Sequence, residues 1–272
     1  MLRNITILIS ALLASAVGTA QTSAAIILLD TFTDNGTPLL SHTPDTNLPG
    51  SAYQGGNYAS NIGATASNTA SIGSDGAFAI SLASSGGYTK PTLFTISADL
   101  NLQGQTGTAG VNDTVTPGQT GFLGGIALGF FNNSDLLAQR RSPLGVVYND
   151  TGRLLLVEPS GAQAKVIAAV STYNGSTPIP VSGTHNLSYD VNTTTGLISN
   201  VTFDGFAITF GAATAVPFND ANTYLAGTYS RAGNSAGTLG TLDNFTISAI
   251  PEPTTVALLA IGVACLARRR RA

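Results

Sequence analysis

Alternating apolar and polar positions recur through the middle of the chain, in short stretches bounded by Gly, Asn, Asp or Pro. This two-residue period is typical of β-strands that bury one face, and the bounding residues are typical of turns. The clearest stretch is 92–100, whose even positions from Phe94 to Leu100 are apolar, while Thr95, Ser97 and Asp99 are polar. The pattern therefore predicts a strand with one solvated face.

The same criteria predict further strands at 26–32, 77–82, 121–131, 146–148, 153–157, 165–170, 185–191, 197–203, 206–210, 224–229 and 241–249. Turn residues at 149–152 and 192–196 predict two hairpins. The only helical candidate between the two ends of the chain is 136–141. So many short strands indicate an all-β sandwich or barrel. We favour a two-sheet antiparallel β-sandwich, in which the apolar faces of the sheets pack together.

The first 25 residues have the layout of a secretory signal peptide. Arg3 supplies a positive charge, residues 5–17 are mostly apolar, and small residues follow. Cleavage is expected after Ala25, because Ile26 then starts the first strand; cleavage after Ala20 is the alternative. The chain is therefore expected to use the Sec machinery and signal peptidase. An uncleaved N-terminal anchor is the competing interpretation.

The C-terminal segment predicts a membrane anchor. Pro251 and Pro253 fix the backbone φ and offer no amide donor, so the tripeptide around Glu252 stays extended. Residues 254–267 are apolar and span about 21 Å as a transmembrane helix, less than the ~30 Å hydrocarbon core of a bilayer. The cations that follow would hold this end in the cytoplasm: Arg268, Arg269, Arg270 and Arg271. A C-terminal core helix is the competing interpretation.

This tail resembles the PEP-CTERM sorting signal of Gram-negative bacteria. The resemblance rests on Pro251-Glu252-Pro253, on the apolar run at 256–262 and on the terminal arginines. It implies that the protein is a substrate of an exosortase, a membrane transpeptidase-like enzyme that would recognise the tripeptide while the inner membrane holds the anchor transiently. It also implies export through the inner membrane to the cell envelope, the cell surface or the extracellular matrix.

Between the signal peptide at 1–25 and the sorting signal at 251–272 lies a single expected domain, 26–250. Cys265 is the only cysteine of the chain, so the domain is expected to contain neither disulfides nor reactive thiols. Within 26–250, 13 acidic residues outnumber 6 basic ones. An acidic surface disfavours nucleic acid and anionic membranes as partners, and it is compatible with calcium and neutral glycans.

A second resemblance concerns this domain. The paired strands and Thr-Gly turn at 185–205 resemble those of laminin-G-like, concanavalin A-like jelly rolls. Residues 30–37, 42–45 and 242–247 resemble the opening and closing segments of such domains in other PEP-CTERM proteins. The resemblance implies a jelly-roll ectodomain and bears on the fold more than on any ligand.

Residues that could carry catalysis are few. Glycosidases need two carboxylates flanking the scissile bond, yet Glu158 is the only glutamate of the domain and lies in no Glu-x-Asp-x-x-Glu strand. His42 lies in a turn and His185 heads a strand, and neither belongs to a Gly-x-Ser-x-Gly or HExxH motif. We therefore expect no catalytic residues and no enzyme activity.

Two aspartates have the parity of buried positions. Asp30 alternates with Leu28 and Phe32 in the first predicted strand, and Asp243 alternates with Phe245 in the last. Because such strands often pair in jelly rolls, both carboxylates are expected close together and turned inward. A buried carboxylate needs hydrogen bonds or a metal. Backbone amides are the ordinary partners, and a structural calcium ion is the alternative. No other cofactor is expected.

These observations predict an exported, non-catalytic surface protein associated with the exopolysaccharide matrix. A carbohydrate-binding module is the alternative. Because the chain has no tryptophan, such a module would present tyrosines of loop-like stretches to the sugar: Tyr53, Tyr58, Tyr88 and Tyr173. A cryptic glycoside hydrolase is the third interpretation, although no spacing of aspartates selects a catalytic pair.

Overall fold

The structure is a computed structural model. It describes residues 25–33, 36, 38–46, 53–55, 62–64, 69–73, 77–82, 90–103, 116–121, 124–131, 144–160, 163–216, 225–231 and 238–250. Residues Ile26–Ala249 form one compact unit. The expected signal peptide, the expected C-terminal anchor and the helical candidate at 136–141 lie outside the described residues. Within the described ranges, no helix is long and apolar enough to cross a membrane.

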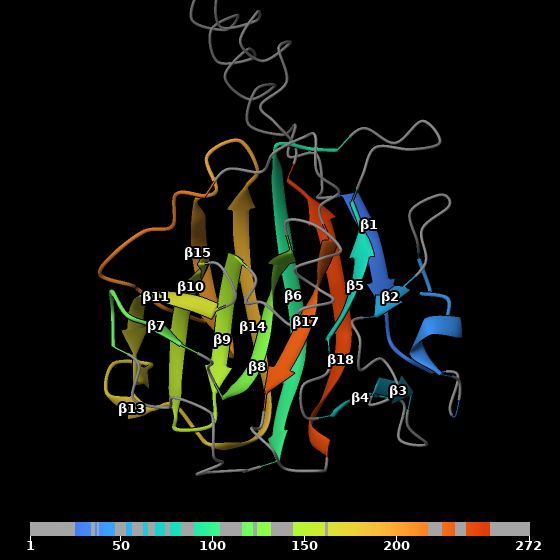
Figure 1. The fold of residues 1–272 in the computed structure, drawn as a ribbon, viewed down its shortest axis with the longest axis horizontal. Helices are drawn as coiled ribbons and strands as arrows, with labels where there is room; N and C mark the ends of the chain where they lie inside the picture. The colour runs from blue at the N-terminus through green and yellow to red at the C-terminus, as the bar shows by residue number, and fades with distance from the viewer. Residues whose placement is uncertain are drawn as a thin grey trace, which may run out of the picture. The chain divides into compact units, whose positions relative to one another are not determined.

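Two large sheets account for most of the described residues (Figure 1). The first, which we call sheet 1, has the order β16-β15-β14-β6-β18-β4-β3, and β1 also pairs with β18. Its strands are β16 (Phe206–Ala207), β15 (Ile198–Phe203), β14 (Ser182–Asn192), β6 (Leu93–Gln103), β18 (Thr238–Ala249), β4 (Ala70–Gly73), β3 (Ile62–Ala64) and β1 (Ala25–Asp30).

The second sheet, sheet 2, has the order β2-β5-β17-β8-β9-β10-β11-β7. Its strands are β2 (Tyr53–Gly55), β5 (Ala77–Ser81), β17 (Leu225–Arg231), β8 (Gly125–Phe131), β9 (Leu144–Asn149), β10 (Arg153–Ser160), β11 (Gln163–Val170) and β7 (Thr120–Gly121). A small third sheet pairs β12 (Thr172–Tyr173) with β13 (Thr177–Pro178), and η1 (Leu39–Ser41) is a short 3-10 turn.

Strand pairing confirms the predicted all-β, two-sheet antiparallel sandwich. Strand β6 pairs antiparallel with β14 along its whole length, from Leu93 opposite Asn192 to Gln103 opposite Ser182. The predicted hairpins are both present, as β9–β10 and β14–β15. The first and last strands of the sandwich pair as expected, because β1 lies against β18.

The core lies between the facing sides of the two sheets. The apolar face predicted for β6 is confirmed, since Phe94, Ile96, Ala98 and Leu100 are fully buried. Sheet 2 also buries apolar side chains on its opposite face, in a second cluster that includes Ala127, Val147, Leu155 and Val166. Strands buried on both faces read as continuous apolar runs, and for that reason β8 and β9 show little alternation.

Some predicted strands differ from the structure in extent. The strand expected at 206–210 ends at Ala207, after which the chain leaves sheet 1. The short strands β2, β3, β4, β12 and β13 were not predicted, because two to four residues give no measurable alternation. Strands β12 and β13 are joined through Asn174 and Gly175, both with positive φ, the conformation that a tight hairpin turn requires.

Candidate functional site

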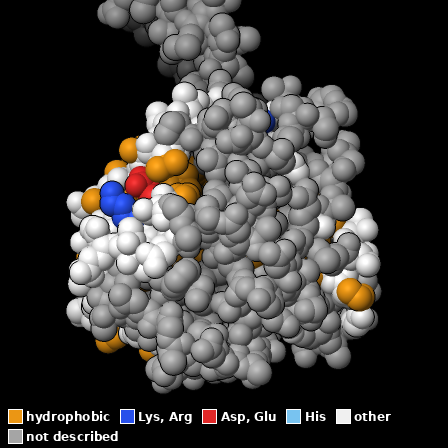
Figure 2. Space-filling view, in the orientation of Figure 1, with side chains coloured by type: hydrophobic (Ala, Val, Ile, Leu, Met, Phe, Trp, Pro, Cys, Tyr) orange, Lys and Arg blue, Asp and Glu red, His pale blue; other side chains and the backbone are white. Residues whose placement is uncertain are grey.

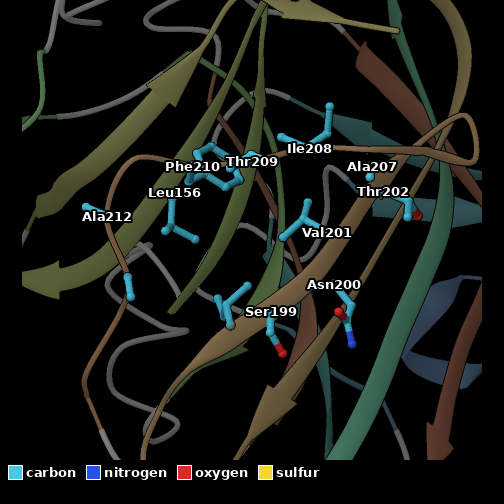
Figure 3. Close-up of a pocket in the computed structure, with 12 residues that line it drawn as sticks. Leu156, Ser199, Asn200, Val201, Thr202, Ala207, Ile208, Thr209, Phe210 and Ala212 are labelled. Atoms are coloured by element: carbon cyan, nitrogen blue, oxygen red, sulfur yellow. The ribbon is translucent and has the colours of Figure 1, made fainter. Parts of the chain in front are cut away.

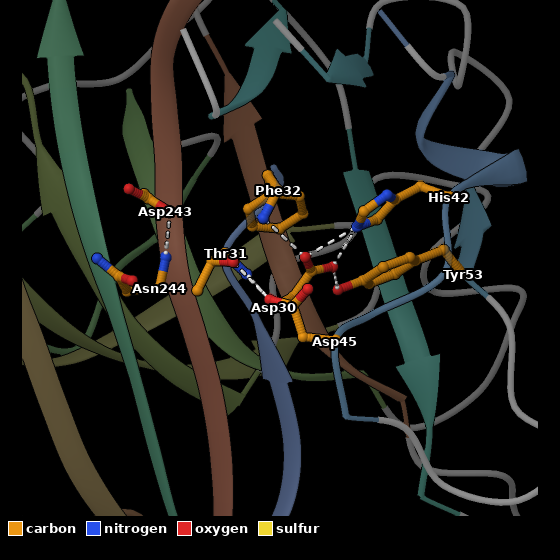
Figure 4. Close-up of polar contacts among 8 residues, drawn as sticks. All are labelled: Asp30, Thr31, Phe32, His42, Asp45, Tyr53, Asp243 and Asn244. Carbon is orange, nitrogen blue, oxygen red and sulfur yellow. Dashed lines mark hydrogen bonds and ion pairs between the residues drawn. The ribbon is translucent and has the colours of Figure 1, made fainter. Parts of the chain in front are cut away.

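Asp30 lies at the end of β1, fully buried, and is the centre of a polar cluster (Figure 4). The His42 Nε2 atom lies 2.8 Å from both carboxylate oxygens. The Tyr53 hydroxyl donates to Oδ2 at 2.6 Å, and the Phe32 amide donates to Oδ1 at 2.9 Å. We call these four residues the Asp30 cluster. It satisfies the buried carboxylate with three donors, which is the hydrogen-bonded outcome considered for this position.

Aromatic packing encloses the Asp30 cluster. The His42 ring stacks on Phe32 at a centroid distance of 5.4 Å and on Tyr53 at 6.0 Å. Burial, together with the Asp30 carboxylate, raises the pKa of Tyr53 well above its ordinary value. Tyr53 is only 4% exposed, so the expectation that it presents an exposed platform to sugars is wrong. The cluster is a structural junction that ties the end of β1 to β2.

The inward orientation expected of Asp243 is wrong. Strand β18 is irregular between Asp243 and Thr246, and Asn244 has a φ of 50°. The extra residue of this bulge reverses the side-chain parity, so Leu242 and Phe245 are buried, whereas Asp243 is partly exposed. In Figure 4, Asp243 points away from the Asp30 cluster and accepts the Asn244 amide at 2.7 Å. Among the described residues, no group of three or more His, Cys, Asp or Glu is placed to hold a metal ion.

Asp243→Asn is expected to stabilise the protein at neutral pH. Desolvation, with Asp99 and Asp30 nearby, raises the pKa of Asp243, although the Asn244 amide opposes the shift. A raised carboxyl pKa in the folded state means that ionisation destabilises the fold, so stability falls as the pH rises through the folded pKa. Because the side chain meets solvent, the gain should stay below about 1 kcal/mol.

Melting temperatures of wild type and Asp243→Asn, measured from pH 3 to pH 7, check this expectation. The difference should be largest at neutral pH and vanish where the wild-type carboxyl is protonated. A variant that is less stable than wild type at pH 7 would contradict the stated effect of burial.

His185, the second histidine considered, also has a carboxylate partner. Its Nδ1 atom lies 2.7 Å from Asp204 Oδ2, and its ring stacks on Phe203 at 5.1 Å. Tyr173 packs edge-on against Phe203 at 5.2 Å. Burial, with Asp204 and Tyr173 nearby, raises the pKa of Tyr148, whose ring packs edge-on against the His185 ring at a centroid distance of 5.9 Å. This arrangement is an aromatic packing cluster with a hydrogen-bonded histidine at its rim.

The outer side of sheet 1 is covered with short polar side chains, and we call it the polar face. Its members are Thr95, Ser97, Asp99, Asn101, Thr184, Asn186, Ser188, Asp190, Ser199, Thr202, Thr241, Asp243, Thr246 and Ser248, on the four strands β6, β14, β15 and β18. None of these is basic or large and apolar. The polar face thus offers hydroxyl, amide and carboxylate groups on a sheet whose strands are about 4.8 Å apart.

Hydrogen bonds across the strands hold the acidic groups of the polar face. Asp99 accepts the side-chain amides of Asn186 at 2.8 Å and Asn244 at 2.7 Å. Asp190 accepts the Thr95 hydroxyl at 2.6 Å and the Asn200 amide at 2.7 Å. Asn200 and Asn244 are both bulge residues with a φ of 50°. The bulges therefore turn two asparagine side chains onto neighbouring aspartates, which fixes the face.

A groove of about 500 Å³ borders the polar face at β15 (Figure 3). Its volume falls within the roughly 300–1,000 Å³ typical of small-molecule sites. The residues that line it are Leu156, Ile198, Ser199, Asn200, Val201, Thr202, Ala207, Ile208, Thr209, Phe210, Ala212 and Ala213. None of them is charged. The sequence pattern does not indicate this groove, because it predicts that the strand continues past Ala207.

The C-terminal segment carries the residues that resemble a sorting signal. Strand β18 ends at Ala249, and the sequence profile of the PEP-CTERM protein-sorting motif matches residues 249–271. The chain carries a PEP-CTERM motif. This match confirms the resemblance of the tail. Proteins with this motif are exported and sorted to the cell surface by an exosortase. The PEP-CTERM tripeptide Pro251-Glu252-Pro253 and the arginines that follow lie outside the described residues.

Several solved structures are similar to this PEP-CTERM protein in fold. Domain 4 of an extracellular GH43 arabinanase from Geobacillus stearothermophilus, in complex with arabinotriose, is 16% identical at a TM-score of 0.40, over 87% of this chain and 98% of that one. Trypanosoma rangeli sialidase is 13% identical at a TM-score of 0.46, over 87% of this chain and 33% of the sialidase chain. The binding domain of botulinum neurotoxin serotype D is 9% identical at a TM-score of 0.47, over 88% of this chain and 52% of the neurotoxin chain. No curated protein matches the sequence. The fold assignment rests on the strand pairing described above.

Proposed function

We propose that this PEP-CTERM protein is a non-catalytic component of the cell surface or of the exopolysaccharide matrix, where its sandwich binds neutral polysaccharide. The observation that carries the proposal is the sorting motif at 249–271, which directs the chain to the compartment that holds such polymers. The polar face supports it, because its hydroxyl and amide groups match the hydroxyls of a glycan and its carboxylates repel acidic polymers.

The partners of the residues considered for catalysis support a non-catalytic role. His42 and His185 are each hydrogen-bonded to an aspartate within an aromatic cluster. The Glu158 carboxylate accepts the amide of Ala215 at 2.7 Å. Glu158 also lies opposite Lys165 in the strand register of sheet 2, next to a charge of opposite sign. Figure 2 shows acidic and basic side chains side by side on the surface, near a group of apolar ones. These contacts stabilise the fold and leave the neutral groups of sheet 1 for binding.

Binding to polysaccharide of the host tests the proposal. The exopolysaccharide is separated into neutral and acidic fractions by ion exchange, and each is immobilised and presented to the full-length protein in detergent. Retention on the neutral fraction is expected to exceed retention on the acidic one by about tenfold, a difference of about 1.4 kcal/mol. Ser97→Trp, at the centre of the polar face between Ser188 and Thr246, should weaken this binding.

Thr177→Trp is the matched control, because Thr177 is exposed on the small β12–β13 sheet. It should bind like wild type. Failure of the wild-type protein to bind any neutral fraction would overturn the proposed function, and equal loss in both variants would exclude the polar face.

A carbohydrate-binding module of the concanavalin A-like jelly-roll type is the second candidate. The observation that favours it is the uncharged groove beside β15, whose volume is typical of small-molecule sites. Of the tyrosines considered as sugar platforms, Tyr58 and Tyr88 lie outside the described residues. Tyr173 is half-buried and packs edge-on against Phe206, a residue that is 43% exposed.

A further inference from the structure

The groove beside β15 is bridged by a segment that is anchored at both ends. We call residues 208–214 the arch. At its start the Ile208 amide donates to the Val201 carbonyl at 2.8 Å. At its end the Thr214 hydroxyl accepts the Ile198 amide at 2.9 Å and donates to the Gly196 carbonyl at 2.8 Å. The arch thus frames a fixed opening, and a fixed opening binds a ligand without losing loop entropy.

The end of the arch at Thr214 is buried and packs closely against the turn at Gly196. Thr214 is only 3% exposed. Gly196 has a φ of 71°, and a Cβ added there would lie 2.0 Å from the Val216 carbonyl oxygen. Only glycine therefore allows the turn before β15 and the end of the arch to approach this closely. The groove is part of the folded framework, not a gap between surface loops.

The lining of the groove divides into an apolar floor and a polar rim. Leu156, Ile198, Val201 and Ile208 are buried and form the floor, with half-buried Phe210 beside them. The rim carries side chains with hydroxyl and amide groups: Ser199, Asn200, Thr202 and Thr209. A sugar ring has the same division, since its C–H groups are apolar and its hydroxyls lie around the edge. Small-molecule sites combine apolar surface with a few such polar groups.

Asn200 is the rim residue whose orientation is best defined. Its bulge conformation, with a φ of 50°, places it at the groove, and its amide nitrogen donates to Asp190 Oδ2 at 2.7 Å. Asp190 is held in turn by the Thr95 hydroxyl. This second layer of hydrogen bonds fixes the Asn200 amide group and sets its carbonyl oxygen as an acceptor for a ligand hydroxyl.

The surroundings of the groove select against acidic ligands. Two carboxylates lie next to it, Asp190 on the side of the polar face and Glu158 on the side of the arch, where it binds the Ala215 amide. No lining residue is basic. An acidic sugar would be repelled by Asp190 and would find no cation in the lining, whereas the charge of Glu158 is offset by Lys165 opposite it.

We propose that the groove beneath the arch binds a neutral sugar unit of the polysaccharide, through the floor at Phe210 and the rim at Asn200. This inference rests on the proposed function, since it names the place on the sandwich that recognises the glycan. The polar face then contacts neighbouring units of the same chain, because Ser199 and Thr202 belong to both surfaces.

A groove-filling substitution tests the proposal. Ala212 lines the groove and is exposed, so Ala212→Trp should occupy the opening without disturbing the core. Oligosaccharides released from the neutral fraction of the host exopolysaccharide serve as the probe, with calorimetry on the full-length protein in detergent. Ala212→Trp is expected to lower the affinity about tenfold or more. Asn200→Asp should lower it as well, because a second carboxylate beside Asp190 breaks their hydrogen bond.

Ala215→Trp is the matched control, because Ala215 is exposed, lies just beyond the arch and does not line the groove. Its affinity should stay within about twofold of wild type. Equal affinity of wild type and Ala212→Trp would overturn the groove assignment while leaving the proposed function standing. Binding of acidic oligosaccharides as tight as that of neutral ones would overturn both. Absence of binding by the wild-type protein would overturn both.

Discussion

Asp30→Ala is expected to destabilise the sandwich by about 3–5 kcal/mol, the usual cost of removing one partner from a buried ion-paired or hydrogen-bonded group. The substitution leaves His42 Nε2, the Tyr53 hydroxyl and the Phe32 amide without their common acceptor in the interior. Since these groups join β1 to β2, the loss should also loosen the pairing of β1 with β18. Urea unfolding of the purified protein, followed by circular dichroism, measures the change in the free energy of unfolding.

Two further variants separate the Asp30 cluster from general surface effects. Asp30→Asn keeps one acceptor oxygen and should lie between wild type and Asp30→Ala. Asp45→Ala removes a carboxylate that accepts the Thr31 amide at 2.9 Å at an exposed site, so it should cost about 1 kcal/mol or less. If Asp30→Ala were no more destabilising than Asp45→Ala, the Asp30 cluster would have no special structural role.

Replacing Pro251, Glu252 and Pro253 together with alanine is expected to abolish surface sorting. The chain should still be exported, because the signal peptide expected at 1–25 is unchanged, but it should accumulate in the inner membrane with the expected C-terminal anchor uncut. The reason is that exosortase processing depends on this motif, and alanine removes the two prolines that are expected to keep the tripeptide extended. Fractionation of a tagged protein in its host measures the distribution.

Changing Arg268–Arg271 to glutamine provides a contrasting variant. Cations at one end of a span set its orientation, so their loss should let the tail slip toward the periplasm or expose the chain to degradation. The tripeptide variant should therefore remain intact in the inner membrane, and the arginine variant should not. If both reached the surface like wild type, the tail would not direct sorting.

Sequence periodicity predicted the longer strands of sheet 1, among them β6, β14 and β18, because one face of that sheet meets water. Every second residue is buried from Phe94 to Leu102 in β6 and from Leu187 to Val191 in β14, so the alternation is regular there. Sheet 2 is buried on both faces in β8 and β9, which removes the polar positions from which a strand boundary can be read. For β9 and β10, the turn residues at 149–152 that join them supplied a further signal.

The candidate sites were less predictable because they depend on single backbone irregularities. One extra residue at Asn244 turned Asp243 away from the interior, and the corresponding bulge at Asn200 placed an amide at the groove. An asparagine is a common residue for such a conformation, but the sequence does not say which asparagine adopts it. Asp30 was correctly expected to be buried, on the same side of its strand as the buried Leu28.

The position of β18 has a consequence for the timing of folding. Of the described strands it is the last to be synthesised, yet it lies inside sheet 1, between β6 and the strands β4 and β1. Sheet 1 therefore stays incomplete until the ribosome has made residue 249. Strand β1 cannot pair with β18 until then, which is near the end of translation. Pairings between such distant segments form slowly. A chain whose ends must meet before it folds remains extended while it is threaded through a narrow secretion channel.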